Sequence, residues 1–431
     1  MDWQKTGLAQ RGNKLLVGKI PCDSLARDYG TPLYVINESR MRDNVRRLRD
    51  EFSRHYSKVR IHYSCKANSN LAVMAIARQE GCLLDAVSPG EVYLALKAGF
   101  RPEQILYTGN NVKNEELAFA LKTRVRMTID STSQLARLAK LAGPKHPEIA
   151  IRVNPDVGAG HHNHCITGGR NAKFGIWEDQ TEEAAATARK AGMKLVGVQM
   201  HIGSGILEVD PYLPAIRRLV ELAAGIQGEP GEDLEFIDMG GGLGVPYKPE
   251  ERELDLPHFA SEVTRTFLES SRACGIRGTP YLALEPGRYL VADAVVLLTT
   301  VNTIKKTPYR HFVGVDAGFN DLVRPAMYGS YHHILNASNM VAPAVKVDVV
   351  GPLCESGDIF ARDREVPQPG EGDVLAILNA GAYGYSMSSQ YNSRPRAAEV
   401  LVSDGEVALV RERESLQSLA AGQQVPERFA R

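Results

Sequence analysis

The amino-acid sequence predicts an α/β fold: a (β/α)₈ TIM barrel followed by a C-terminal β-domain, a β-barrel or sandwich, that the N-terminal strands join. Between residues 38 and 285, strand patterns alternate with helical patterns in about eight units over about 250 residues, the size and rhythm of a closed barrel. An open doubly wound sheet would show the same alternation, usually with fewer units. After residue 285, strand patterns recur at short spacing with turn residues between them. We therefore expect a barrel over 38–280 and a β-domain over 1–37 and 281–431.

Taken in order, the chain begins with strand patterns at 14–18 and 31–36 that flank a short helix. The alternating region then predicts helices at 38–55, 69–80, 89–98, 113–122, 131–142, 180–191, 210–226 and 256–274. The strands of the same region fall at 59–65, 82–87, 104–108, 126–130, 148–153, 195–201, 234–238 and 281–285. The all-β region predicts strands at 294–304, 311–315, 344–351, 373–378 and 398–402.

The composition is that of a soluble globular protein, with 43% apolar residues, 24% charged residues and a formal net charge of zero. This balance provides no basic surface for nucleic acid, and no apolar run is long enough for a signal peptide or a membrane span. The six cysteines are scattered without the paired spacing of a zinc site or a disulfide framework. We therefore expect a cytoplasmic protein with reduced thiols that binds no nucleic acid, no membrane and no metal.

One stretch, 59–69, organises the prediction of function, because its buried strand ends in Lys66. Val59, Ile61 and Tyr63 alternate with more polar residues, which is typical of a strand packed on both sides. A lone lysine at a strand end is most often a solvated side chain. The alternative is an amine that forms a Schiff base with a carbonyl. Lys66 alone does not decide between these interpretations.

The other predicted strands also end in polar residues, and in a barrel the C-terminal ends of the strands face the active site. These residues are Lys66, Asp85, Thr108, Asn110, Asp130, Arg152, Asn154, His201, Asp238 and Glu285. Chance would leave several of these ends apolar. We therefore expect a functional site at this end of the barrel.

A glycine-rich turn, Gly240–Gly244, follows one of these strands and can bring backbone N–H groups close to a phosphate. Val245 breaks the dinucleotide-binding pattern, so a single phosphate is the better interpretation, with a plain flexible turn as the alternative. His201 could be a base, a metal ligand or a flat ring stacked on a planar cofactor, whereas taken alone it is most often a hydrogen-bonded histidine with no such role. Because no second histidine stands at ligand spacing, a metal is the weaker interpretation. Ser204 could add a hydroxyl to the phosphate.

Glu285 ends a strand that should be buried, so its carboxylate needs a positive or proton-bearing partner. The ring nitrogen of a pyridine is such a partner, and a carboxylate there keeps the ring protonated. Pairing with Arg288 is the alternative. The histidines of His161-His162-Asn163-His164 lack partners at metal-ligand spacing, so we interpret them as part of a loop.

A lysine, a phosphate cradle, a flat histidine and a buried carboxylate are together what pyridoxal 5'-phosphate needs. At this point the chain resembles the diaminopimelate decarboxylases, pyridoxal-phosphate enzymes of the Orn/DAP/Arg decarboxylase family with an alanine-racemase-like barrel. The resemblance runs from Gly30 to about Val402. It rests on long motifs: Tyr63-Ser-Cys-Lys-Ala-Asn, Asp85-Ala-Val-Ser-Pro-Gly-Glu, Arg152-Val-Asn-Pro, Lys173-Phe-Gly, His201-Ile-Gly-Ser, Asp238-Met-Gly-Gly-Gly-Leu-Gly, Glu285-Pro-Gly-Arg, Arg324-Pro-Ala-Met-Tyr, Gly351-Pro-Leu-Cys-Glu-Ser-Gly-Asp and Gly381-Ala-Tyr-Gly. Pro89 and the loop 158–172 depart from the commonest family pattern.

The resemblance implies a role for each matched residue. Lys66 would bind the cofactor covalently and Cys354 would donate the proton. The cofactor-binding residues would be Lys66, Asp85, His201, Ser204, Gly241, Gly242, Glu285, Gly287, Arg288 and Tyr383. The substrate-binding residues would be Arg288, Arg324, Tyr328, Glu355 and Tyr383. Cys354 and Glu355 would enter the active site of the other subunit, so the resemblance also implies a homodimer with shared active sites.

The activity implied is decarboxylation of meso-2,6-diaminopimelate to L-lysine and carbon dioxide, the last step of lysine biosynthesis. Two arginines, Arg288 and Arg324, suit the distal carboxylate of that substrate, and Glu355 suits its distal ammonium. Pro325 is expected to hold Arg324 in an extended conformation. One alternative is a decarboxylase or racemase of the same fold with another substrate. Another is a non-catalytic pyridoxal-phosphate-binding homologue, which should have lost Lys66 or Cys354.

Overall fold

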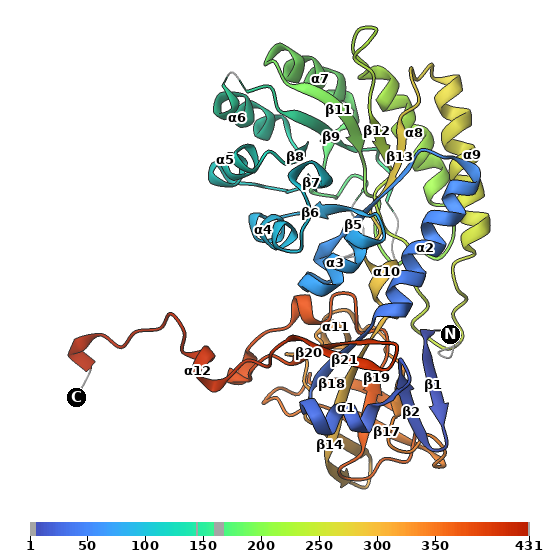
Figure 1. The fold of residues 1–431 in the computed structure, drawn as a ribbon, viewed down its shortest axis with the longest axis vertical. Helices are drawn as coiled ribbons and strands as arrows, with labels where there is room; N and C mark the ends of the chain where they lie inside the picture. Colours follow the sequence, from blue (N-terminus) through green and yellow to red (C-terminus); the bar gives the residue numbers. More distant parts are fainter. Residues whose placement is uncertain (1–5, 144, 159–167, 430–431) are drawn as a thin grey trace. The chain divides into compact units, whose positions relative to one another are not determined.

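The computed structural model describes residues 6–143, 145–158 and 168–429 and divides into two compact units. The first unit comprises Arg40–Ala292, and the second comprises Asp2–Ser39 together with Asp293–Arg431. Each unit contains its own sheet (Figure 1). The histidines at 161–164 lie outside the described residues, so the loop interpretation stays a prediction.

The first unit is a closed barrel of parallel strands, which confirms the predicted (β/α)₈ fold. Its strands are β5 (Val59–Ser64), β6 (Leu83–Ala86), β7 (Ile105–Tyr107), β8 (Arg126–Ile129), β9 (Glu148–Asn154), β11 (Lys194–Gln199), β12 (Phe236–Asp238) and β13 (Tyr281–Leu284). Each pairs with its neighbour in parallel, and β13 closes the barrel on β5 with Leu282 opposite Val59. A short strand, β10 (Ile176–Trp177), adds to β9 outside the ring.

Helices surround this ring of strands (Figure 1). They are α2 (Glu38–His55), α3 (Leu71–Gln79), α4 (Pro89–Lys97), α5 (Asn114–Thr123), α6 (Thr132–Ala142), α7 (Thr181–Lys190), α8 (Tyr212–Gly225), α9 (Leu256–Ala273) and the short α10 (Arg288–Val291). The helix α2 buries Met41, Val45, Leu48 and Phe52, whose spacing of three or four residues gives a helix one apolar face. Several helices begin at a capping side chain; for example, Ser88 accepts a hydrogen bond from the backbone N–H of Glu91 ahead of α4.

Apolar side chains fill the middle of the barrel. Phe236 packs with Leu106, Ala150, Val196 and Ala283. Gly197 leaves the space that the ring of Phe236 occupies, because a Cβ at this position would lie 2.5 Å from the ring. The barrel is therefore a packed core, and its chemistry is confined to the strand ends.

The second unit is mainly β-structure. Its larger sheet follows the order β18 (Ile359–Pro367), β17 (Ala344–Val350), β15 (His311–Val315), β14 (Val295–Lys306), β4 (Leu33–Asn37), β20 (Ala398–Ser403) and β21 (Glu406–Arg411), with β19 (Val374–Ile377) pairing with β14 and with β16 (Ile334–Asn336). The strand β4, from the N-terminal part of the chain, pairs with β14 antiparallel and with β20 in parallel, so it lies inside this sheet between two C-terminal strands. A separate small sheet of β1 (Leu8–Arg11), β2 (Lys14–Val17) and β3 (Ile20–Pro21) precedes α1 (Cys22–Tyr29).

The predicted boundary at residue 280 falls too early. The strand β13 begins at Tyr281 and belongs to the barrel, because its pairing with β5 closes the ring. The first unit then continues through α10 to Ala292. The sequence pattern changes at the end of β13, whereas the packing changes only where β14 enters the second sheet.

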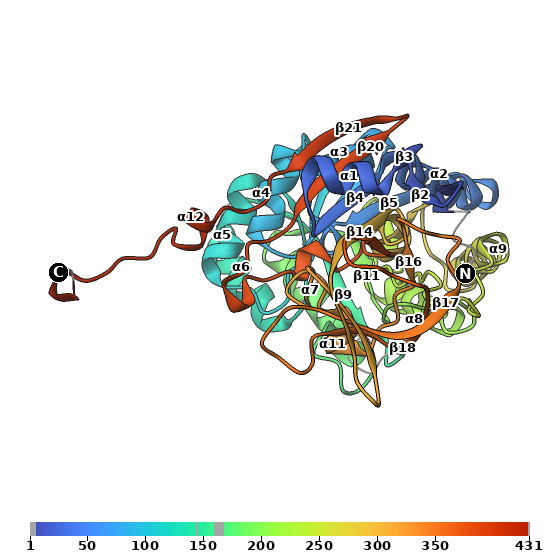
Figure 2. The ribbon, with the colours of Figure 1, turned by 90° about the horizontal axis from the view of Figure 1, so that it is seen from below.

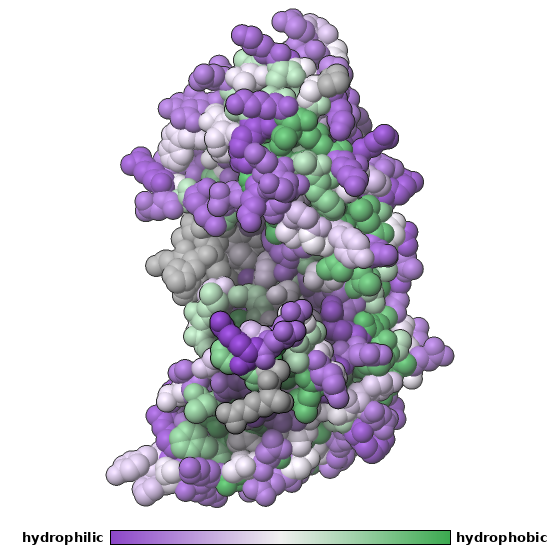
Figure 3. Space-filling view, turned by 90° about the vertical axis from the view of Figure 1, so that its left-hand side faces the viewer, coloured by the Kyte–Doolittle hydropathy of each residue, from purple (hydrophilic) through white to green (hydrophobic). Residues whose placement is uncertain are grey.

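After β21 the chain passes through the short helix α12 (Leu416–Leu419) and runs away from the second sheet in both ribbon views (Figures 1 and 2). On the face shown in Figure 3, hydrophilic side chains predominate and hydrophobic residues form smaller areas between them. Among the described residues, no helix is both long enough and apolar enough to span a membrane. The described cysteines, five of the six, are free thiols.

Candidate active site

Lys66 lies in a single 3₁₀ turn, Cys65–Ala67, directly after β5. Its Nζ atom lies 2.7 Å from Oδ2 of Asp85, which ends the neighbouring strand β6. Asp85 also accepts hydrogen bonds from the hydroxyls of Ser64, at 2.8 Å, and Thr108. Burial alone would raise the pKa of Asp85, but the Lys66 ammonium and these hydrogen bonds hold that pKa below its usual value. The lysine is therefore paired with a carboxylate that stays ionised.

The glycine turn after β12 is closely packed. A Cβ on Gly241 would lie 2.0 Å from the carbonyl oxygen of Glu285, and Gly242 has a φ of +102°, which disfavours any other residue. The backbone N–H of Gly240 donates to Oδ1 of Asp238 at 2.8 Å, which fixes the start of the turn. Only glycine fits here, because the turn packs directly against the backbone of the neighbouring strand ends.

His201 follows β11 and lies beside this turn. Its Nδ1 accepts a hydrogen bond from the backbone N–H of Gly241 at 3.2 Å. Burial, together with the positive charges of Lys66 and Arg152, lowers the pKa of His201 to about 3. The imidazole is therefore a neutral flat ring with its proton on Nε2, which suits stacking better than proton transfer at neutral pH.

Glu285 is buried where β13 ends. Its Oε2 accepts a hydrogen bond from Nε2 of Gln199 at 3.0 Å, whereas its Oε1 has no hydrogen-bond partner among the described residues. Burial and the nearby carboxylates of Asp238 and Asp85 raise the pKa of Glu285 well above its usual value. The carboxyl therefore ionises only beside a positive partner, and a protonated ring nitrogen at Oε1 would be such a partner.

Arg288 begins α10 and is buried. It donates hydrogen bonds to Oγ of Ser204 at 3.1 Å and to the hydroxyl of Tyr247 at 2.9 Å. These contacts favour the interpretation in which Glu285 serves a ring nitrogen over the one in which it pairs with Arg288. Gly287 packs tightly just before this helix, since a Cβ there would lie 3.0 Å from Cβ of Ala67.

The barrel unit therefore brings together most of the predicted cofactor residues: Lys66, Asp85, His201, Ser204, Gly241, Gly242, Glu285, Gly287 and Arg288. Sequence reasoning missed two residues that contact this group, Gln199 and Tyr247. Gln199 could have been found, because it precedes His201 by two residues and alternation puts both on one face of the strand. The sequence around Tyr247 contains no motif that predicts its contact with Arg288.

The remaining predicted residues belong to the second unit: Arg324, Tyr328, Cys354, Glu355 and Tyr383. Arg324 is buried and its guanidinium donates to Oγ of Ser330 at 3.1 Å. It is the first residue of α11 (Arg324–Tyr328), so the expected extended conformation is wrong: Pro325 lies in the first turn, where a helix tolerates proline.

Cys354 and Glu355 are exposed in a tight turn after β17. The carboxylate of Asp358 fixes this turn by accepting hydrogen bonds from the backbone N–H groups of Leu353, at 2.8 Å, and Phe319, at 2.7 Å. The backbone N–H of Cys354 donates to Oδ1 of Asn392 at 2.8 Å. Tyr383 has a φ of +58°, a strained conformation for a tyrosine and one that clusters at functional sites.

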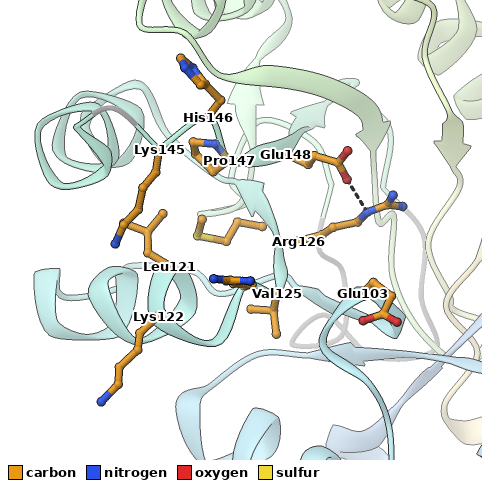
Figure 4. A pocket seen from close by; sticks show the side chains of 11 residues that line it. Glu103, Leu121, Lys122, Val125, Arg126, Lys145, His146, Pro147 and Glu148 are labelled. Atoms are coloured by element: carbon orange, nitrogen blue, oxygen red, sulfur yellow. Dashed lines mark hydrogen bonds and ion pairs between the residues drawn. The ribbon is translucent and has the colours of Figure 1, made fainter.

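A separate cavity of about 520 Å³ lies at the opposite end of the barrel strands, where β8 and β9 begin (Figure 4). Arg126, in its lining, donates to Glu148 at 3.0 Å and also pairs with Glu235 at 2.8 Å. No predicted site residue is among the lining residues that the structure describes. Because this end of a barrel contributes stability rather than chemistry, we assign the cavity no part in catalysis.

Residues 40–292 match the family described as "Pyridoxal-dependent decarboxylase, pyridoxal binding domain". The chain is 56% identical over 416 residues to the diaminopimelate decarboxylase of Methanothermobacter thermautotrophicus, with 96% of each chain covered. The chain belongs to the diaminopimelate decarboxylase family. A second member, from Archaeoglobus fulgidus, is 42% identical and covers 96% of this chain and 97% of its own.

Solved structures of diaminopimelate decarboxylases share the fold. The enzyme from M. jannaschii in co-complex with L-lysine superposes with a TM-score of 0.90 at 35% identity, covering 98% of both chains. The enzyme from Helicobacter pylori complexed with L-lysine gives a TM-score of 0.83 at 33% identity, covering 92% of this chain and 98% of the other. As a diaminopimelate decarboxylase family member, the chain is a carboxy-lyase that uses pyridoxal 5'-phosphate.

The barrel end fits this cofactor on two independent observations. The first is the buried Oε1 atom of Glu285, which has no hydrogen-bond partner among the described residues and which a protonated pyridine nitrogen could contact. The second is the turn at Gly241 and Gly242, where a Cβ would meet the carbonyl oxygens of Glu285 and Gly203, so the turn requires glycine; glycine-rich backbone of this kind can bind a phosphate.

Proposed function

We propose that this chain decarboxylates meso-2,6-diaminopimelate to L-lysine and carbon dioxide in the cytoplasm, as the last step of lysine biosynthesis. The observation that carries the chemistry is the ion pair between Lys66 and Asp85 at the same barrel end as the glycine turn. The substrate is proposed from the near-full-length similarity to diaminopimelate decarboxylases.

In this proposal Lys66 would hold the cofactor covalently, the ring of His201 would stack on the cofactor ring, and Glu285 would bind the ring nitrogen. Ser204, Gly241, Gly242, Gly287 and Arg288 would bind the phosphate, and Tyr383 would contribute to phosphate and substrate binding. When bound, pyridoxal 5'-phosphate supplies an electron sink for the carboxylate-cleaving step.

The chain's own residues then position the substrate and move the proton. Asp85 orients the Lys66 amine before the cofactor binds, because its carboxylate stays ionised beside that amine. Cys354 would donate its thiol proton to Cα after carbon dioxide has left, which completes the product. The guanidinium groups of Arg288 and Arg324 bind the distal carboxylate, Glu355 binds the distal ammonium, and Tyr328 packs against the substrate.

We further propose a homodimer in which Cys354 and Glu355 complete the site of the partner subunit. The exposure of both residues, on a turn that Asp358 holds rigidly, supports this arrangement. Mixing inactive Lys66→Ala protein with inactive Cys354→Ala protein should restore activity to about a quarter of the wild-type level if subunits exchange randomly. No recovery after demonstrated subunit exchange would place each site within one chain.

The proposed reaction is tested by measuring carbon dioxide release from meso-diaminopimelate, lysine, ornithine and arginine. We expect meso-diaminopimelate to be decarboxylated with by far the highest kcat/KM of the four. Borohydride reduction of the holoenzyme should attach the cofactor to the peptide that contains Lys66, and Lys66→Ala should lose both turnover and this attachment. Turnover of another amino acid at a higher kcat/KM would overturn the substrate assignment, and near-normal turnover by Lys66→Ala would overturn the role of the lysine.

A further inference from the structure

We propose that Gln199 is a positioning residue that turns the Glu285 carboxylate and reserves one of its oxygens for the ring nitrogen of the cofactor. The inference rests on the proposed function and deepens it, because it names the residue that orients the carboxylate toward the ring nitrogen.

The barrel register brings Gln199 to this position. It is the last residue of β11, where it stands opposite Arg152 of β9 and Asp238 of β12. Its side chain is buried, with only 1% of the residue exposed. His201 follows two residues after the end of β11, so Gln199 and His201 both come from the end of the same strand.

The hydrogen bond is selective between the two carboxylate oxygens of Glu285. The Gln199 amide donates to Oε2 at 3.0 Å and leaves Oε1 as the atom without a partner among the described residues. Without this bond the carboxylate could rotate about its terminal torsion, which has a broad energy minimum. The amide therefore selects both the orientation of the carboxylate and the oxygen that faces the ligand.

A neutral amide is the appropriate donor at this position. Two further carboxylates, Asp85 and Asp238, act electrostatically on Glu285. A hydrogen bond to the charged form of Glu285 favours ionisation without adding a cation. An arginine or lysine at position 199 would pair with the carboxylate itself and compete with a protonated ring. Gln199 thus makes a negative Glu285 less costly and keeps its charge available to the cofactor.

The alternative is that Gln199 only fills space between the strand ends. Its amide oxygen, Oε1, is buried and also has no hydrogen-bond partner among the described residues. A side chain selected only for packing would not leave a polar atom unsatisfied here, since such an atom costs about 1–3 kcal/mol. The cost is explained if the donor nitrogen performs a task that an apolar side chain cannot.

The test measures cofactor binding without substrate. The probes are pyridoxal 5'-phosphate and its 1-deaza analogue, in which a carbon replaces the ring nitrogen. Gln199→Met should weaken binding of pyridoxal 5'-phosphate by about ten- to a hundred-fold, the range for losing a hydrogen bond to a charged group. The same variant should bind the deaza analogue as wild type does, because that analogue has no ring nitrogen for Glu285 to meet.

Gln134→Met is the matched control. Gln134 is another buried glutamine near this barrel end, and its side chain accepts a hydrogen bond from the backbone N–H of Asp130 at 2.9 Å. Its loss should lower stability without discriminating between the two probes. Where Gln199→Met does not fold, Gln199→Asn takes its place, because its shorter amide cannot reach Glu285 and should give the same discrimination.

Equal weakening of both probes, or unchanged affinity for pyridoxal 5'-phosphate, would overturn the inference. In Glu285→Gln protein, adding Gln199→Met should have little further effect on cofactor affinity, because both changes remove one interaction. A wild-type chain that binds both probes as expected but releases no carbon dioxide from meso-diaminopimelate would contradict the proposed function alone.

Discussion

The Nζ atom of Lys66 lies 2.7 Å from Oδ2 of Asp85, and the same oxygen accepts a hydrogen bond from Ser64 at 2.8 Å. Lys66 follows β5 in a single 3₁₀ turn, and the register of β5 with β6 places Ser64, the last residue of β5, opposite Asp85. The position of the amine is therefore set by the barrel itself rather than by a flexible loop. We therefore expect Asp85 to orient the Lys66 amine for its reaction with the cofactor.

Asp85→Asn should lower kcat/KM by about ten- to a hundred-fold, because an amide cannot replace the charge-assisted hydrogen bond to the lysine. The variant should also form its covalent bond with the cofactor more slowly, as followed by visible absorbance after mixing apoenzyme with pyridoxal 5'-phosphate. Thr108→Val is the matched control, since it removes only the neutral hydroxyl that donates to the same carboxylate. A variant that reacts with the cofactor at the wild-type rate would show that Asp85 does not present the lysine.

Gly241→Ala should abolish tight cofactor binding, because its Cβ would lie 2.0 Å from the carbonyl oxygen of Glu285 and would displace the turn. The affinity for pyridoxal 5'-phosphate, measured by titration of apoenzyme, should fall by more than about a hundred-fold, since the backbone must move away from the phosphate. Gly90→Ala is the control, because a Cβ at this exposed position would meet its nearest atom at an ordinary 3.7 Å. If both variants bind the cofactor equally well, the turn is not the phosphate site.

Much of this site could be predicted from the sequence, because the regular strand–helix period identifies the strand ends and those ends are polar. The pairing of Gln199 with Glu285 could not, since it depends on which strands become neighbours across β11, β12 and β13. The strand β18 was also missed, because the charged residues from Arg362 to Glu365 conceal its apolar alternation. Likewise, a rule for the residue before proline failed at Arg324, where the first turn of a helix accommodates Pro325.

The stability of the folded protein should depend on pH because of the titration of Asp238. Burial, with added repulsion from Asp85 and in spite of the hydrogen bond from Gly240, raises the pKa of Asp238 to about 7. The unfolded chain has a pKa of about 3.9 for this group, so the folded state binds the proton more tightly. The stability gained in this way is complete below the unfolded pKa and is lost as the pH rises through about 7.

Asp238→Asn removes this titration but keeps an oxygen that can accept from Gly240. The Tm of wild-type apoenzyme, measured from about pH 5 to about pH 8, should therefore fall relative to that of the variant as the pH rises. Asp255→Asn, at the exposed N-cap of α9, is the control, and its Tm should change with pH in the same way as that of wild type. Parallel curves for Asp238→Asn as well would mean that this carboxyl does not hold a proton in the folded protein.

Arg324 should contribute to substrate choice. This arginine is buried in the second unit, and its guanidinium donates to Ser330 at 3.1 Å, so its fork is held in one orientation. In the proposed function it pairs with the distal carboxylate of diaminopimelate. Losing one charge-assisted pair should lower kcat/KM for meso-diaminopimelate by about ten- to a hundred-fold. Arg324→Lys should be impaired too, because a point charge cannot form the bidentate pair.

The decisive measurement is the ratio of kcat/KM for meso-diaminopimelate to that for lysine, which lacks the distal carboxylate. Arg324→Ala should shrink this ratio, because it removes an interaction that only the larger substrate makes. Arg362→Ala, at an exposed arginine of β18, should leave it unchanged. If Arg324→Ala lowers kcat/KM for both substrates by the same factor, the arginine supports the fold of its unit but does not bind the distal carboxylate. Selectivity would then have to come from Arg288, whose contacts with Ser204 and Tyr247 already place it at the barrel end.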